Sequence, residues 1–180
     1  MIRILILVFL VGCGYYEKPD DKDPLTNTAF PNPRIKHEID EGLRNYFDAF
    51  MKDADLYGVN TDLVSKLRYV KFGETESARN DRSVGICSSY GDEEDLMYTT
   101  ILISDSLKTS PIQLRAVVYH ELGHCVLRME HSPQSPPTIM SPMMSSEIFY
   151  KRNWDRLVRN LFTGESIPHG LASAENELLY

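Results

Sequence analysis

Three histidines in the stretch HELGHCVLRMEH, residues 120–131, limit how this chain can fold. His120 and His124 are four residues apart, so on a helix they lie on one face, one turn apart. If that helix continued, His131 would lie about 10 Å further along its axis than His124, beyond the reach of a shared metal ion. The pattern therefore predicts a helix that passes through His124 and ends before His131, so that all three side chains can bind one ion.

The spacing of apolar residues predicts the other elements of an α+β fold, a small mixed sheet packed on helices. Ser110, Pro111 and Gln113 predict the start of the histidine-bearing helix, with Ser110 and Gln113 as a capping box, and the helix should reach about Arg128. The remaining elements are an amphipathic helix at 34–58, strands at 67–72, 83–90 and 96–104, an irregular proline-rich segment at 132–144 and a last helix at 145–162.

The composition is typical of one soluble globular domain. The 180 residues have room for one ordinary domain with a hydrophobic core, which we expect to cover residues 34–180. No apolar run approaches the roughly 20 residues that a membrane-spanning helix needs. The formal net charge is −7 and no cluster of Lys and Arg stands out, which argues against a nucleic-acid partner. We expect a monomer.

The first 33 residues differ from the rest of the chain. Residues 1–12, MIRILILVFLVG, combine Arg3 with a short apolar run, which is typical of a signal peptide. The run LVGC resembles the lipobox of bacterial lipoproteins, which implies that Cys13 is acylated and begins the mature chain. Residues 13–33 are rich in proline and charge and are expected to form a flexible linker. The resemblance implies a lipid anchor in the bacterial cell envelope, in the outer membrane because Gly14 follows the cysteine.

The HELGH run also contains a residue suited to proton transfer. Glu121 is rotated by roughly 100° from His120 around the helix, so it points away from the metal axis but can reach a water at an open coordination position. A zinc ion lowers the pKa of such a water towards about 7, and Glu121 can accept its proton and return it to a leaving amine. The pattern predicts a zinc hydrolase with His120 and His124 as ligands and Glu121 as general base.

HELGH, His131 and the later run TIMSP together resemble the metzincin clan of zinc endopeptidases, whose motif is HExxHxxGxxH followed by a methionine turn. The resemblance implies that His131 is the third zinc ligand and that Met140 forms the floor beneath the metal. It also implies a twisted sheet packed on the active-site helix and a C-terminal helix. The function implied is hydrolysis of peptide bonds, with strand 96–104 or its neighbour lining the cleft and pairing with an extended peptide substrate.

The chain departs from this motif in the spacing of the third histidine. His131 follows His124 by seven residues instead of six, so strict spacing would place Glu130 at the ligand position. The family's glycine is also missing, because Leu127 stands in its place and no glycine lies between the two histidines. We favour His131, since neutral imidazole is the commoner metal ligand, and keep Glu130 as the alternative.

Other interpretations stay open at this point. Glu147, on the last helix, could be the third ligand, as in thermolysin-like hydrolases. The chain could be a surface lipoprotein that uses the metal for structure or adhesion without catalysis, or a hydrolase of a non-protein amide such as a cell-wall cross-link. Cys87 and Cys125 either form a disulfide, if the compartment is oxidising and the two are close, or are buried free thiols.

Overall fold

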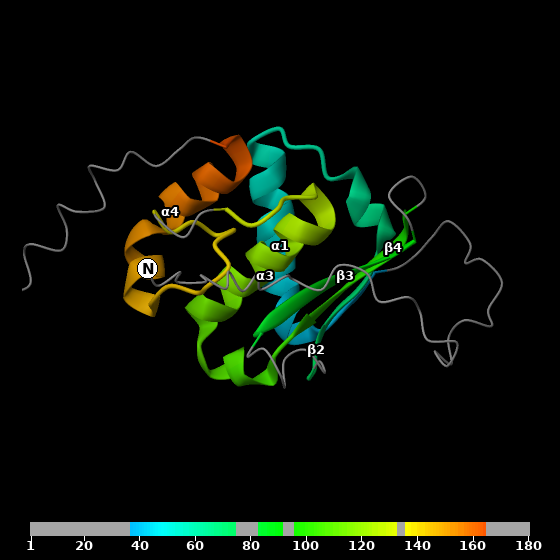
Figure 1. Ribbon diagram of the computed structural model, residues 1–180, viewed down its shortest axis with the longest axis horizontal. Helices are drawn as coiled ribbons and strands as arrows, with labels where there is room; N and C mark the ends of the chain where they lie inside the picture. The colour runs from blue at the N-terminus through cyan, green and yellow to red at the C-terminus, as the bar shows by residue number, and fades with distance from the viewer. Residues whose placement is uncertain (1–36, 75–82, 92–95, 133–135, 165–180) are drawn as a thin grey trace, which may run out of the picture.

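A four-stranded mixed sheet and three helices make up the computed structural model, which describes residues 37–74, 83–91, 96–132 and 136–164 (Figure 1). The predicted α+β class is confirmed. Cys13 and the predicted signal peptide and linker lie outside the described residues. Within the described residues, no helix is both long and apolar enough to cross a membrane.

The sheet has the strand order β1-β2-β4-β3. The strands β1 (Glu38–Ile39), β2 (Leu67–Phe72) and β4 (Leu96–Ile103) are parallel, and β3 (Gly85–Gly91) is antiparallel to β4. The three strands predicted from the sequence are confirmed to within two residues at each end. β4 cannot pair with an additional peptide strand, because β2 and β3 pair with it on both sides, whereas its neighbour β3 lies at one edge of the sheet.

The helix α3 (Pro111–Leu127) lies at the centre of the fold. It contacts β3 and β4 on one side and α1 (Glu41–Leu56) and α4 (Glu147–Thr163) on others, and Figure 1 shows it between the sheet and α4. Residues all around α3 are therefore buried. Two short 3-10 helices, η1 (Asp62–Lys66) and η2 (Asp105–Thr109), precede β2 and α3.

Aromatic side chains hold the helices together. Phe50 of α1 and Tyr119 of α3 have no exposed surface, and their rings meet edge to face with centroids 5.3 Å apart. The Tyr119 hydroxyl is not left unpaired in this core, because it donates a hydrogen bond to Asp53 over 2.7 Å. Full burial of a large apolar side chain contributes about 1.5–3 kcal/mol, so such contacts fix α3 firmly in place.

Two details of the sequence prediction are wrong. The first helix begins at Glu41, because residues 38 and 39 form β1, in which the buried Ile39 pairs with Val70. A buried Ile at this spacing satisfies a helical pattern and a strand equally well, so periodicity alone could not place the boundary. The predicted capping box at Ser110 is also absent. The Ser110 side chain makes no cap and donates its hydroxyl to Glu147 at the start of α4.

Candidate metal centre

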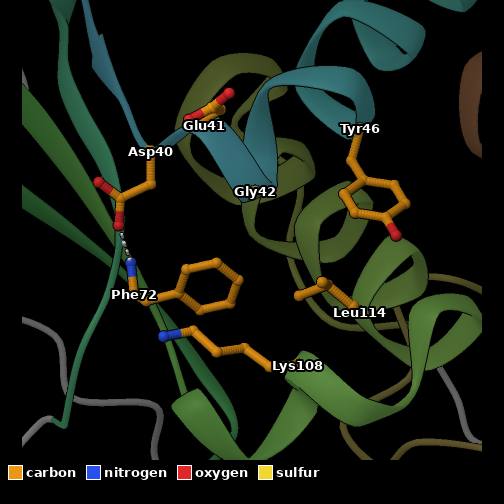
Figure 2. Close-up of a pocket in the computed structure, with 7 residues that line it drawn as sticks. All are labelled: Asp40, Glu41, Gly42, Tyr46, Phe72, Lys108 and Leu114. Carbon is orange, nitrogen blue, oxygen red and sulfur yellow. Dashed lines mark hydrogen bonds between the residues drawn. The ribbon is translucent and has the colours of Figure 1, made fainter.

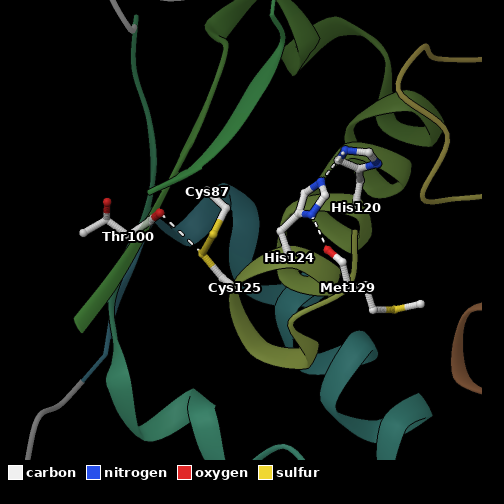
Figure 3. Close-up of a disulfide and its surroundings, with 6 residues drawn as sticks. All are labelled: Cys87, Thr100, His120, His124, Cys125 and Met129. Carbon is white, nitrogen blue, oxygen red and sulfur yellow. Dashed lines mark hydrogen bonds between the residues drawn. A yellow bond between two sulfur atoms is a disulfide. The ribbon is translucent and has the colours of Figure 1, made fainter. Parts of the chain in front are cut away.

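Two of the three histidines project from the same face of α3. His120 and His124 are half-buried, and their Nε2 atoms are 3.1 Å apart (Figure 3). This is the one-turn separation expected for residues four apart on a helix. The prediction that HELGH lies within a helix is confirmed.

The helix ends at Leu127, and the chain reverses at Arg128. Arg128 has φ 57° and ψ 31°, a left-handed conformation that favours glycine, and it is the one non-glycine residue with positive φ in the described part of the chain. The N–H groups of Arg128 and Met129 both donate to the carbonyl of Gly123. The predicted helix break between His124 and His131 is therefore found, without the glycine that such a turn usually contains.

This turn brings His131 back to the helix. Its Nε2 is 3.2 Å from Nε2 of His120, and one nitrogen from each of the three histidines lies within 4.8 Å of the others. Glu130 is exposed and does not belong to this group. Of the two candidates for the third ligand, the structure brings His131 to the site.

Backbone carbonyls fix the orientation of two imidazoles. Nδ1 of His120 is 2.7 Å from the Ile139 carbonyl, and Nδ1 of His124 is 2.6 Å from the Met129 carbonyl. A carbonyl oxygen only accepts hydrogen bonds, so each Nδ1 carries the proton and each Nε2 presents a lone pair. The Nε2 atoms of these two residues face each other without a proton between them. A bound cation would remove the repulsion between them, and the group could hold a metal ion.

The protonation state of the site supports cation binding. Burial and, to a smaller extent, the positive charges that His124 and His131 would carry lower the pKa of His120 to about 4, against the opposing effect of the hydrogen bond to Ile139. Burial also lowers the pKa of His124 and of His131, the most exposed of the three. Neutral imidazoles are the form that binds metal ions, so the ligands need no deprotonation near pH 7.

Glu121 is turned away from the histidines towards the sheet. Its side chain is buried, with 4% of its surface exposed, and the backbone N–H of Cys87 in β3 donates a hydrogen bond to its carboxylate. Burial raises the pKa of this carboxyl to about 8, and the hydrogen bond from Cys87 opposes that rise. The structure thus places the Glu121 carboxyl on the side of α3 that faces the edge strand, one residue after His120.

Met140 lies directly beneath the histidine-bearing turn of α3. The methionine is buried, and a Cβ atom added to Gly123 would meet its Sδ at 2.5 Å. The preceding residue, Ile139, supplies the carbonyl that orients His120, and the Met140 carbonyl accepts a hydrogen bond from the Ser132 N–H. The segment predicted as a methionine turn therefore orients His120 and also binds the backbone at Ser132, directly after His131.

Cys87 and Cys125 form a disulfide between β3 and α3, with Cα atoms 5.7 Å apart. Of the two states left open by the sequence, the structure has the bonded one. Figure 3 shows the disulfide between the strands and α3. The strands lie on one side of the disulfide, and the imidazoles of His120 and His124 lie on the other. Sγ of Cys125 lies 3.6 Å from the Thr100 carbonyl, but a disulfide sulfur carries no proton, so this is a packing contact and not a hydrogen bond.

Glu147 does not belong to the histidine group. Its carboxylate accepts a hydrogen bond from Ser110, at the start of α3, and pairs with Lys151 on its own helix. His120 is ten residues further along α3 than Ser110, which places it about 15 Å away along the axis. Glu147 as a third metal ligand, the thermolysin-like interpretation, is therefore wrong for this structure.

The hollow in Figure 2 lies away from the histidines. Its volume is about 460 Å³, and it lies at the start of α1, where the Asp40 carboxylate accepts a hydrogen bond from the Phe72 N–H. The ammonium of Lys108 lies 4.4 Å from the centre of the Phe72 ring and pairs with Asp105. These polar and charged groups already have partners within the protein, so the hollow offers no comparable set of ligand atoms.

Sequence reasoning missed the groups that orient the site. The carbonyls of Met129 and Ile139 leave no signal in the sequence, since every residue has one. Gly85 lies against Glu121, and Gly123 lies against Met140, so each glycine permits a close approach.

Comparisons with protein-family models, with curated proteins and with solved structures find no match.

Proposed function

We propose that the protein is a zinc-dependent endopeptidase of metzincin type. One observation carries this proposal: the three imidazoles converge on one point, and Glu121 follows His120 directly on the same helix. In the described residues no fourth His, Cys, Asp or Glu joins the group. Three protein ligands with an open position are typical of catalytic zinc, whereas structural zinc has four.

Two of the three distances between the imidazole nitrogens suit zinc. Three nitrogens bound at about 2.0–2.1 Å in a tetrahedron lie about 3.3 Å apart. Nε2 of His120 lies 3.1 Å from that of His124 and 3.2 Å from that of His131. A zinc ion held there would polarise a substrate carbonyl and lower the pKa of a bound water.

The chain's own residues then perform the other steps. His120, His124 and His131 would hold the ion, and the carbonyls of Ile139 and Met129 fix the orientation of His120 and His124. Glu121 takes a proton from the attacking water and returns it to the amine of the cleaved bond. The edge strand β3, which pairs only with β4 in the described structure, offers its free side to an extended peptide.

Three features favour the metzincin type over other zinc hydrolases. In the metzincin motif the glycine of the turn precedes the third histidine by three residues, and here the left-handed Arg128 precedes His131 by three. The extra residue therefore lies in the helix, before the turn. Met140 packs beneath the site, and a C-terminal helix, α4, follows it.

Peptide cleavage tests this function. The full chain, purified in detergent and loaded with zinc, would be incubated with an unbiased peptide library beside Glu121→Gln, which keeps the shape of the side chain but cannot accept the proton. We expect internal cuts from the wild type and a loss of about 100-fold or more in the variant. Equal cleavage by both proteins would exclude Glu121 as the base, and no cleavage by either, with one zinc bound per chain, would favour a non-catalytic metal protein.

We also propose that the protein is lipid-anchored through Cys13 in the bacterial outer membrane, on the lipobox resemblance of LVGC. Incorporation of a labelled fatty acid in a bacterial host tests this proposal. The wild type should take up the label, and Cys13→Ser should not. Labelling of the variant would exclude Cys13 as the acylated residue.

A further inference from the structure

We propose that β3 positions Glu121 for catalysis and that the Cys87–Cys125 disulfide holds β3 in this place. Opening the disulfide then lowers peptide hydrolysis without releasing the metal. Cys87 is then a positioning residue that acts through Glu121. This inference rests on the proposed function for its catalytic part. Its structural part, the attachment of β3 to α3, is independent of that function.

The contact between β3 and Glu121 is unusually close. A Cβ atom added to Gly85 would lie 2.6 Å from Oε1 of Glu121 and 2.6 Å from Cγ1 of Val117, so only glycine leaves room for the carboxylate here. Two residues further along β3, the N–H of Cys87 donates to that carboxylate. The strand therefore sets the place of the Glu121 side chain from two neighbouring positions.

The disulfide joins the two elements at this contact. Cys87 is the residue whose N–H binds Glu121, and Cys125 follows His124 directly on α3. Because β3 is an edge strand, the described structure holds it mainly by its ladder to β4 and by its contacts with α3. Without the disulfide the ladder to β4 still orders the strand, but its distance from Glu121 is no longer fixed by a covalent bond.

The metal ligands do not depend on β3. His120 is oriented by Ile139 and His124 by Met129, and both carbonyls belong to segments that follow α3 in the chain. The turn at Arg128 that returns His131 is closed by the Gly123 carbonyl, within α3 itself. A shift of β3 would therefore move the N–H that holds Glu121 and leave the three imidazoles in place.

A dithiol reductant would open the bond in two exchange steps. Its thiolate attacks Sγ of Cys87, which is half-buried, and displaces Cys125, which is fully buried, as a thiolate that takes up a proton. The second thiol of the reductant then releases Cys87 as a thiol and leaves as the oxidised disulfide, so two electrons and two protons pass to the protein. The new Cys125 thiol has an acceptor at hand in the Thr100 carbonyl, 3.6 Å away.

The test compares the full chain in three forms: oxidised wild type, wild type reduced with dithiothreitol that is removed before zinc is added, and the variant Cys87→Ser/Cys125→Ser. Arg152→Ala, an exposed change on α4, is the control. Zinc affinity, kcat, KM and amide hydrogen exchange in β3 are measured on each. We expect both disulfide-free forms to keep zinc affinity within about 3-fold, to lose about 10-fold or more in kcat with a smaller change in KM, and to exchange faster in β3.

A kcat within about 2-fold of the oxidised enzyme would overturn the catalytic part, because a disulfide that only stabilises the fold leaves kcat unchanged while the protein is folded. Unchanged exchange in β3 would overturn the structural part. If the oxidised wild type cleaves nothing, the proposed function fails, and the exchange measurement still decides whether the disulfide holds β3. If the double variant does not fold, Gly85→Ala replaces it: this variant keeps the disulfide, and we expect the same fall in kcat with zinc affinity retained.

Discussion

Arg128 adopts a backbone conformation that an L residue with a side chain seldom takes. Its φ of 57° is needed for the turn that returns His131, and the side chain is exposed. A left-handed conformation destabilises a non-glycine residue by roughly 1–2 kcal/mol relative to glycine. We expect Arg128→Gly to raise the free energy of unfolding by about 1 kcal/mol and Arg128→Ala to leave it nearly unchanged, as measured by urea unfolding. A less stable glycine variant would show that the arginine side chain has a role of its own.

Gly123 is constrained by Met140. An alanine Cβ at this position would meet Sδ at 2.5 Å and Cε at 3.2 Å, and Met140 is buried and cannot move freely. We expect Gly123→Ala to destabilise the protein by about 1–3 kcal/mol and to weaken zinc binding, because a displaced Met140 moves the Ile139 carbonyl away from His120. Unfolding and zinc titration both measure this effect.

The control for this prediction is the same change in a Met140→Ala background. That background provides room for the new methyl group, so Gly123→Ala should then have a much smaller effect, and the two substitutions should not be additive. An equal effect in both backgrounds would show that the alanine acts through another neighbour of Gly123.

Glu147 links the starts of two helices and gives the fold a pH dependence. The hydrogen bond from Ser110, with a smaller contribution from Lys151, holds the pKa of Glu147 below its ordinary value of 4.5. A carboxyl with a lowered pKa adds stability that is fully present above pH 4.5 and is lost as the pH falls through the folded-state pKa. We expect Ser110→Ala to lower the melting temperature at about pH 7 and to have a smaller effect at about pH 3.

Lys151→Ala is the comparison for this pH effect. Its ammonium lies 3.6 Å from Glu147 on an exposed helix face, so its removal should lower the melting temperature by less than Ser110→Ala does. A Ser110→Ala effect that is the same at both pH values would show that Glu147 is not the group responsible.

At the scale of elements, apolar spacing predicted most of the fold. The strands β2, β3 and β4 and the helices α3 and α4 were placed to within a few residues, because each buries apolar residues at regular spacing. Apolar spacing failed at Ile39, which is buried in a strand where a helix was expected, and the capping pattern failed at Ser110, whose hydroxyl donates to Glu147 of another helix instead of capping its own. Both errors arise from partners distant in the sequence, which local patterns do not encode.

For the candidate site, the sequence predicted the groups that could bind a metal but not the groups that orient them. His120 and His124 follow from helix geometry alone, and His131 was preferred on the chemistry of imidazole. The pairing of Cys87 with Cys125 stayed open because the distance between β3 and α3 has no local signal. The approach of β3 to Glu121 is likewise a consequence of tertiary packing.

The packing of α4 on α3 gives a prediction at this scale. Leu157 of α4 is fully buried, whereas Ile148 on the same helix is 62% exposed. We expect Leu157→Ala to lower the free energy of unfolding by about 2–5 kcal/mol, since it leaves a cavity in the core, and Ile148→Ala to change it by less than about 1 kcal/mol. Similar effects of the two changes in urea unfolding would contradict the position of α4 on α3.

At the scale of the whole molecule, a metal ion at the three histidines would connect α3 with the chain that follows its C-terminal turn. Two ligands lie on α3, the third lies after the turn, and the carbonyl that orients His120 lies in the methionine segment. The unfolded chain cannot present these groups together, so binding to the folded state adds directly to stability. The stabilisation grows with the free metal concentration and reaches about 4 kcal/mol at 1,000 times Kd.

The stabilisation by bound zinc also tests which residue is the third ligand. We expect zinc to raise the melting temperature of the wild type, a chelator to reverse the rise, and His131→Ala to remove most of it, because only two ligands are then left. Glu130→Ala is the matched control, since Glu130 is the adjacent residue and is exposed. Its zinc-dependent shift should equal that of the wild type. If the shift instead persisted in His131→Ala and disappeared in Glu130→Ala, the turn at Arg128 would present the carboxylate in the zinc-bound protein, and the strict metzincin spacing would apply.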